Sequence, residues 1–183
     1  MARTVDGERI ERLRSSTPPP APNRRALLLK HTLDRLIAAG GLLVMAPIIA
    51  AVALALRLRG GPVLHREQRV GMGGRPVAVR TFAVPDGWRL AALGVPALPQ
   101  LWTVLTGRMS IVGPRPREPG FEAPPARPGL TGLAQLAQLD RWLSVTEQLA
   151  LDERYAREWS LGLDARIIWR TFSSGAGLAR RRP

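Results

Sequence analysis

The chain contains no cysteine, and this absence removes several kinds of chemistry at once. Disulfide bonds, thiolate-bound metal ions and a cysteine nucleophile are all excluded. Lysine is nearly absent too, because Lys30 is the only one and almost all basic residues are arginines. The missing cysteine says little about the compartment in which the protein works.

Negative charge is also in short supply. The 183 residues hold 14 Asp and Glu against 27 Lys and Arg, which gives a formal net charge of +13. Such an excess favours anionic partners: a phospholipid surface, a phosphorylated substrate or nucleic acid. Nucleic acid is not expected, since the sequence shows no recognition-helix pattern and no interleaving of aromatic and basic residues.

Residues 36–56 form an uncharged apolar run that contains a single proline, Pro47. As one helix, the run would be about 30 Å long, enough to cross a bilayer core. Because proline lacks an N–H, we expect a kink or a break at Pro47. Basic residues flank both ends, which favours a segment that enters and leaves the membrane on the same face. The alternative is a buried helix of a soluble core, for which the run is unusually long.

Composition divides the chain into four segments. Residues 1–29 form a polar, proline-broken tail that we expect to be disordered. Residues 30–59 make the membrane anchor, residues 60–174 one small domain, and residues 175–183 a basic tail. The expected fold is α/β and mostly helical. It comprises an N-terminal re-entrant membrane helix and one small cytoplasmic domain with a short β-hairpin.

Patterning within the domain predicts a hairpin and three helices. Val63–His65 and Pro76–Phe82 read as strands on either side of a glycine turn at residues 73–74. The segment 107–128 is rich in proline and is expected to be irregular. Helices are expected where apolar residues recur at helical spacing: 98–105, 146–158 and 163–172.

Two arginines stand next to prolines, which restricts their backbone. Arg115 lies between Pro114 and Pro116, and Arg127 precedes Pro128. A residue before proline is held in extended geometry, so its guanidinium projects from a stiff backbone and can bind phosphate through two hydrogen bonds. Beside a membrane anchor, this pattern favours phosphate binding. The alternative role for both arginines is a salt bridge or carbonyl contact that holds the irregular loop.

An ordered series of motifs runs from about Lys30 to Phe172. Lys30–Asp34 is similar to a Lys-Arg-x-x-Asp opening, and Pro47 follows at the spacing of a broken re-entrant helix. Residues 98–116 (Leu-Pro-Gln-Leu-Trp to Gly-Pro-Arg-Pro) are the most diagnostic, and Arg-Pro-Gly-x-Thr-Gly follows at 127–132. The series resembles the bacterial sugar transferases, the monotopic polyprenyl-phosphate phosphoglycosyl transferases.

The resemblance implies an enzyme that takes a sugar phosphate from a nucleotide diphospho-sugar and passes it to polyprenyl phosphate in the membrane. The family uses the Asp of an adjacent Asp-Glu pair as nucleophile, with Mg²⁺, and forms a phosphosugar-aspartyl intermediate. A place on the cytoplasmic face of the bacterial inner membrane is implied, with a role in exopolysaccharide or lipid-linked glycan synthesis.

The two acids that carry the family's covalent step are missing. Pro96 stands where the Asp is expected and Ala97 where the Glu is expected, and neither can attack phosphorus or bind a cation. The stretch between Phe82 and Trp88 looks shortened by a few tens of residues. Asp86 lies in it, but a nucleophile must be placed to within about half an ångström, so we expect no catalytic residue. The Mg²⁺ implied by the resemblance thereby loses its ligands.

Other family positions are retained. Arg115 and Arg127 keep their expected places as phosphate-binding residues, and Arg141 is the one substitute for an arginine missing after residue 135. Asp152 and Asp164 fall at the family's spacing. We interpret both as structural, Asp164 as a charge at a helix N-terminus and Asp152 as a surface acid with a satisfied charge.

The sequence therefore predicts a sugar transferase family protein in which catalysis is impaired or absent. The alternative is a non-catalytic membrane protein that binds polyprenyl phosphate or pairs with an active transferase.

Overall fold

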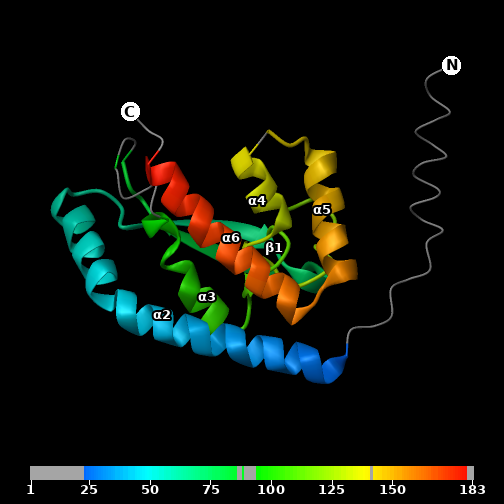
Figure 1. Cartoon of the computed structure of the whole chain (residues 1–183). Helices are drawn as coiled ribbons and strands as arrows, with labels where there is room; N and C mark the ends of the chain where they lie inside the picture. Colours follow the sequence, from blue (N-terminus) through cyan, green and yellow to red (C-terminus); the bar gives the residue numbers. More distant parts are fainter. Residues whose placement is uncertain (1–22, 86–87, 89–93, 141, 181–183) are drawn as a thin grey trace, which may run out of the picture.

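The computed structural model describes residues 23–85, 88, 94–140 and 142–180 (Figure 1). Most of the predicted tail, Asp86 and Arg141 lie outside the described residues. Within them the fold is mostly helical with a small hairpin, as predicted.

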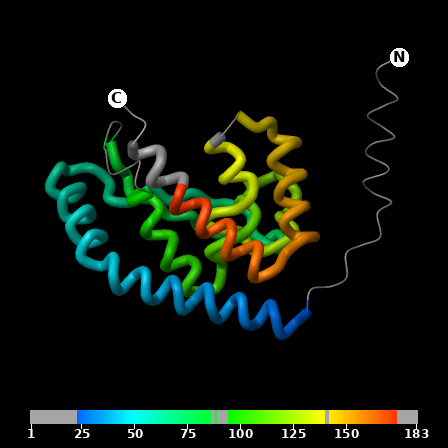
Figure 2. The backbone as a smooth tube through the Cα atoms, viewed as in Figure 1, coloured from blue at the N-terminus to red at the C-terminus, as the bar shows by residue number. Residues whose placement is uncertain are grey.

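The apolar run is the central part of a single long helix, α2 (Arg24–Leu58). It begins before the predicted boundary at residue 30, and the Asn23 side chain caps it by accepting a hydrogen bond from the Arg25 N–H at 3.0 Å. Pro47 lies inside the helix. Figures 1 and 2 show that α2 runs along one side of the domain and then bends towards it. The helix is therefore kinked but not broken.

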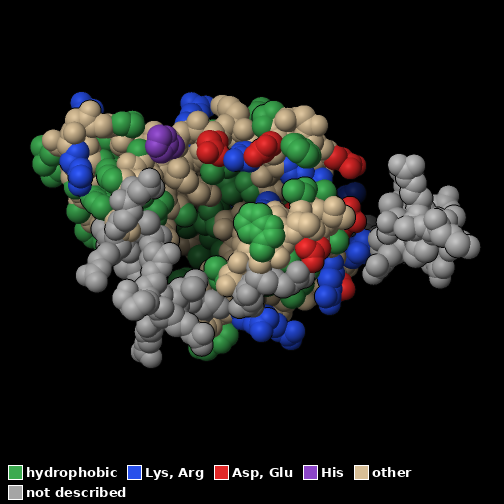
Figure 3. All heavy atoms as spheres, turned by 90° about the horizontal axis from the view of Figure 1, so that it is seen from above, with side chains coloured by type: hydrophobic (Ala, Val, Ile, Leu, Met, Phe, Trp, Pro, Cys, Tyr) green, Lys and Arg blue, Asp and Glu red, His purple; other side chains and the backbone are tan. Residues whose placement is uncertain are grey.

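α2 leaves its apolar side chains uncovered. Its most apolar window is only 11% buried, and the helix is long and apolar enough to cross a membrane. Figure 3 views the molecule from above, the side opposite to α2 in Figure 1. On that side, acidic and basic side chains lie close together. The exposure does not fit a soluble core helix and indicates membrane association. The exposed residues are Leu28, Leu29, Leu33, Leu36, Ile37, Leu43, Val44, Ile48, Leu54 and Leu58.

The predicted hairpin consists of β1 (Leu64–Val70) and β2 (Pro76–Phe82), which pair antiparallel. β2 has the predicted bounds, whereas β1 is longer than expected. The short 3-10 turn η1 (Met72–Gly74) joins them, with Gly73 and Gly74 at φ of 68° and 76°. Glycine adopts this left-handed backbone without steric cost, so the turn explains the glycine pair.

A second, parallel pair of strands was not predicted. β3 (Ser110–Val112) lies beside β4 (Gly129–Thr131), although the sequence indicated an irregular segment around β3. Three residues are too few to show an alternating pattern, and the partner strand is distant in sequence. The pairing is tight, because a Cβ on Gly113 would lie 2.2 Å from the Arg127 carbonyl oxygen.

The remaining elements are helical. The helices are α3 (Gln100–Leu105), α4 (Leu133–Asp140), α5 (Val145–Glu158) and α6 (Leu161–Arg180). α3 follows a 3-10 turn, η3 (Val95–Ala97), and packs on α2. A capping box at Ser144 and Glu147 starts α5. Two helices differ from the prediction: α4 was not expected, and α6 extends into the predicted basic tail.

Two separate apolar clusters lie along α2. One contains Val52, Leu56, Phe82 and Val95 and packs near the C-terminal end of the helix. The larger one joins α2 to the hairpin, α3, β3, α5 and α6. Its buried members are Ala38, Val77, Val104, Met109, Ile111, Val112, Tyr155 and Ile167. Each cluster positions a different candidate region, described below.

Candidate functional site

Asp164, in the first turn of α6, is buried and receives three hydrogen bonds. Its Oδ2 accepts from Lys30 Nζ at 2.7 Å and from Trp159 Nε1 at 3.1 Å. Its Oδ1 accepts from the Tyr155 hydroxyl at 2.7 Å. The predicted charge at a helix N-terminus is therefore correct, and the same carboxylate also joins α2 to α5 and α6.

The amine of Lys30 likewise contacts several other groups. Its Nζ donates to the Val112 carbonyl at 3.0 Å as well as to Asp164, and lies 3.6 Å from Asp34 Oδ2. Asp34 in turn accepts from Ser110 Oγ at 2.5 Å. An ammonium group has three protons, so the amine has little capacity left for a ligand. The Lys30–Asp34 motif thus acts as a structural clamp.

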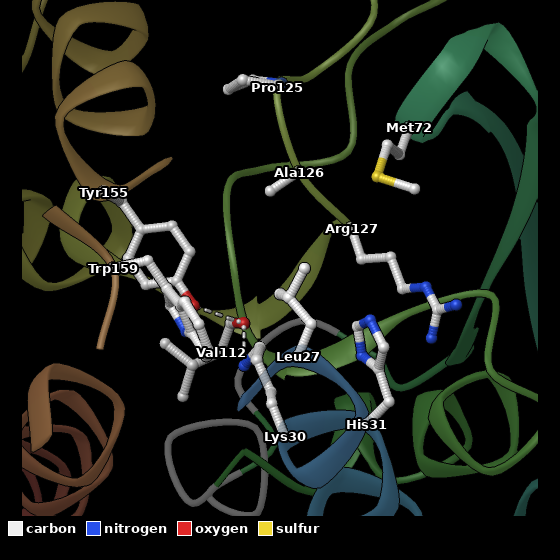
Figure 4. A pocket seen from close by; sticks show the side chains of 10 residues that line it. All are labelled: Leu27, Lys30, His31, Met72, Val112, Pro125, Ala126, Arg127, Tyr155 and Trp159. Atoms are coloured by element: carbon white, nitrogen blue, oxygen red, sulfur yellow. Dashed lines mark hydrogen bonds between the residues drawn. The ribbon is translucent and has the colours of Figure 1, made fainter. Parts of the chain in front are cut away.

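A pocket of about 210 Å³ lies between the first turns of α2 and the chain before β4 (Figure 4). Arg127 and His31 lie beside each other at one edge of it, and Lys30 and Tyr155 meet near the Val112 carbonyl. Its lining residues are Leu27, Lys30, His31, Met72, Val112, Pro125, Ala126, Arg127, Tyr155 and Trp159.

Arg127 brings a charge into this pocket without a protein partner. Its guanidinium forms no hydrogen bond or ion pair with any residue in the described part of the chain. Burial lowers the pKa of Arg127, the nearby charge of Arg35 lowers it further, and Asp34 opposes the shift. The alternative role, a salt bridge, is therefore not formed here, whereas an anionic ligand would be favoured.

Arg115 is held differently. Its Nη1 donates to Gln148 Oε1 at 3.1 Å and its Nη2 donates to Gln138 Oε1. Burial lowers its pKa, and the charge of Asp152 opposes this. Part of the alternative role is thus confirmed, because the side chain ties the proline-rich loop to α4 and α5. Both acceptors are neutral, so the guanidinium keeps its full charge.

Asp152 is not the surface acid that the sequence indicated. It is only 3% exposed, and its Oδ1 accepts from the Arg115 backbone N–H at 3.3 Å. Burial raises its pKa to about 6, although the Arg115 N–H and the charges of Arg117 and Arg115 act in the opposite direction. Its helical position alone gave no signal of this burial, since α4 and the loop cover it from elsewhere in the chain.

Pro96 and Ala97, at which the resemblance places the family's two acids, lie on η3, far along α2 from the pocket. Val95 is buried beside Val52 and Leu56, and Pro96 and Ala97 are half-buried. Lys30, in the pocket wall, precedes Val52 by about 33 Å of helix. Arg127 and the residues Pro96 and Ala97 therefore belong to two separate regions.

The described residues do not bring together a set of Mg²⁺ ligands. Among the described residues no three His, Asp or Glu side chains gather as ligands. The two retained acids are already occupied: Asp164 binds Lys30, and Asp152 contacts the Arg115 backbone. We therefore derive no chemical step through a metal ion.

The sequence pattern of the bacterial sugar transferase family matches residues 25–84 and 87–177, most of the chain. The protein belongs to the bacterial sugar transferase family. The match is interrupted after residue 84, inside the stretch between Phe82 and Trp88 that the sequence indicated as shortened.

Curated relatives agree with this assignment. The UDP-glucose:undecaprenyl-phosphate glucose-1-phosphate transferase of Caulobacter vibrioides is 36% identical over 193 residues, covering 85% of this chain and 72% of that protein. The protein of that name from Escherichia coli is 32% identical, and the alignment covers 87% of this chain but only 42% of the E. coli protein. Exopolysaccharide production protein PSS of Rhizobium leguminosarum bv. phaseoli is 32% identical and covers 81% of this chain and 95% of its own.

The Caulobacter alignment contains positions that this chain lacks. Since 85% of 183 residues is about 156, about 37 of the 193 aligned positions have no residue here. The chain also spans only about two fifths of the E. coli relative.

We predict that Asp164→Asn lowers the free energy of unfolding by about 3–5 kcal/mol, because it removes the carboxylate that is hydrogen-bonded to the buried Lys30 ammonium and leaves only Asp34, at 3.6 Å, as counter-charge. The measurement is thermal unfolding of the detergent-purified chain. Glu158→Gln, which removes an exposed partner of Arg154, serves as control and should change stability by less than about 1 kcal/mol. Equal effects of the two substitutions would contradict the structural role of Asp164.

Asp152 predicts a pH dependence of stability. Its pKa is raised from 3.8 to about 6 in the folded chain, so its contribution is fully present below about pH 4 and is lost as the pH rises through 6. Asp152→Asn cannot ionise, and between pH 5 and 8 it should lose about 1–2 kcal/mol less stability than the wild type. Unfolding midpoints across this range test this, with the neighbouring exposed Glu153→Gln as control. Parallel profiles for Asp152→Asn and the wild type would contradict it.

Proposed function

We propose that the chain is a membrane-associated sugar transferase family protein of exopolysaccharide or lipid-linked glycan synthesis in which the covalent transfer step is impaired. The observation that carries this proposal is η3. Pro96 and Ala97 stand at the two acid positions, and the turn packs through Val95 into an apolar cluster. Neither side chain can form a bond to phosphorus or take up a proton.

The proposed ligands follow from the family and from the arginines. The names of the Caulobacter and E. coli relatives specify UDP-glucose and undecaprenyl phosphate. We propose the same chemical classes here, a nucleotide diphospho-sugar and a polyprenyl phosphate. Arg115 supports phosphate binding, because two neutral glutamines orient its guanidinium without cancelling its charge.

We further propose that α2 is re-entrant and lies at the cytoplasmic face of the inner membrane. Three observations support this disposition: the bend in the helix that contains Pro47, the uncovered apolar side chains, and the basic residues at both ends. The N-terminal part of α2 runs along one side of the domain, and the C-terminal part bends towards the domain (Figure 1). A helix of this shape would place the domain beside the lipid head groups.

The proposal predicts little or no sugar phosphate transfer. The full chain, reconstituted in membranes, is incubated with labelled UDP-glucose and undecaprenyl phosphate, with the Caulobacter relative as positive control. Loss of a covalent nucleophile typically costs several orders of magnitude in rate, so we expect transfer at least about a thousandfold below the control. Transfer within about tenfold of the control would refute impaired catalysis.

Restoring the acids tests whether their loss limits the reaction. We expect Pro96→Asp combined with Ala97→Glu to raise transfer above the wild-type background, because it returns both carboxylates to η3. The matched control is Pro96→Asn with Ala97→Gln, which changes size and polarity without adding a nucleophile. A folded acid variant with no more activity than this control would show that the shortened stretch before η3 is also needed.

The alternative, a non-catalytic protein that binds polyprenyl phosphate or an active transferase, is favoured by the two uncompensated arginines. Under this hypothesis the purified chain retains polyprenyl phosphate, or co-purifies with a transferase that has the acid pair, while showing no transfer itself. Photo-crosslinking with a polyprenyl phosphate probe separates the two forms of the hypothesis. Failure of both capture experiments would exclude it.

A further inference from the structure

The pocket at the start of α2 contains an excess of positive charge. Arg127 is half-buried and lies near Arg35, while the nearby Asp34 carboxylate is already used by Lys30 and Ser110. Arg127 is partly desolvated and is repelled by the exposed Arg35, so an anion bound at its guanidinium would stabilise it. The guanidinium of Arg127 has no hydrogen-bond acceptor within the part of the chain described, so both edges of its fork can serve a ligand.

His31 adds a second unsatisfied group beside Arg127 (Figure 4). Its Nδ1 is buried and has no hydrogen-bond partner among the described residues. An unpaired buried polar atom costs free energy that a ligand or a bound water can return. The two side chains therefore form one polar edge in a pocket that is otherwise mostly apolar.

The rest of the lining is suited to hydrocarbon rather than to water. Leu28, which follows the lining residue Leu27 on α2, is 67% exposed, so apolar surface is also available outside the pocket. A ligand that fits both parts carries a phosphate on an apolar body. The apolar lining residues are Leu27, Met72, Val112, Pro125, Ala126 and Trp159.

The size of the pocket limits how much of such a ligand enters. Its volume of about 210 Å³ is below the roughly 300–1,000 Å³ of pockets that enclose whole small molecules. It can hold a head group, with the hydrocarbon chains outside along the uncovered side of α2. This arrangement is that of a lipid bound at the membrane surface.

The location argues against the lipid acceptor of a transfer reaction. The pocket wall at Lys30 and the η3 contact at Val52 are separated by about 33 Å of helix. Reacting groups must approach to within about 3–3.5 Å. A phosphate held by Arg127 is therefore too far from Pro96 and Ala97 to react there.

We propose that this pocket binds the phosphate of a membrane glycerophospholipid through Arg127 and His31, as a resident lipid that fixes the start of α2 at the head-group level. The proposal goes beyond the transferase assignment, because the lipid is not consumed and the site is separate from η3.

The test measures phospholipid binding by the full chain, purified in detergent and delipidated, with dioleoylphosphatidylglycerol as the probe and native mass spectrometry as the readout. Arg127→Gln should weaken binding about tenfold or more, since it removes charge-assisted hydrogen bonds to the phosphate. Arg66→Gln removes the same charge from an exposed position on β1 and should stay within twofold of the wild type. Equal losses in the two variants would overturn the site.

Two further variants guard against misfolding of Arg127→Gln. Arg127→Lys keeps the charge but not the fork and should bind with intermediate affinity. Ala126→Phe fills the pocket while leaving Arg127 in place, and should also weaken binding. In the wild type alone, saturating lipid should raise the unfolding temperature. Full binding by a folded Ala126→Phe variant would overturn the assignment to this pocket.

Two other probes identify the ligand class. Inorganic phosphate should bind at least tenfold more weakly than phosphatidylglycerol, and equal binding would remove the lipid from the proposal. A preference of more than tenfold for undecaprenyl phosphate would overturn the resident-lipid role and assign the pocket to the acceptor. None of these measurements reads transfer, so their failure leaves the proposal for η3 unaffected, and the reverse also holds.

Discussion

The amine of Lys30 is buried together with the carboxylate of Asp164, and the position of the domain on its apolar helix depends on this pair. Removing both charges from water costs several kcal/mol per ion. That cost is offset by the Val112 carbonyl on the lysine and by the Tyr155 hydroxyl and Trp159 indole on the aspartate. Since the partners come from α2, β3, α5 and α6, one polar cluster fixes four elements against one another.

This clamp lies apart from η3, the turn at which the family resemblance places the two acids. The polar cluster lies towards the N-terminal end of α2, whereas Pro96 and Ala97 lie on a turn packed against Val52 and Leu56. A substitution at η3 would therefore leave every partner of Lys30 and Asp164 in place. The two arginines also lie in other surroundings than η3. Arg115 is held by glutamines of α4 and α5, and Arg127 lines the pocket.

Local pattern predicted much of the fold. The alternation in Pro76–Phe82, the glycine turn and the apolar run of α2 gave correct elements, because each is specified by neighbouring residues. β3 and α4 were missed for different reasons: β3 lies in the segment expected to be irregular and needs a partner strand from a later segment, whereas α4 is only eight residues long and lies in a stretch for which no helix was predicted. Among the site residues, Asp152 was misjudged, and Arg141 lies outside the described residues.

The sequence by itself determined the apolar helix and the family, and it led to the prediction that Pro96 and Ala97 replace the acid pair, since these follow from residue identity and spacing along the chain. Only the tertiary structure decided which charges are neutralised. Lys30 and Asp164 are 134 residues apart yet paired, while Arg127 finds no acceptor among the described residues in a pocket that also contains Lys30. Burial and charge pairing depend on segments brought together by folding, and no local pattern encodes them.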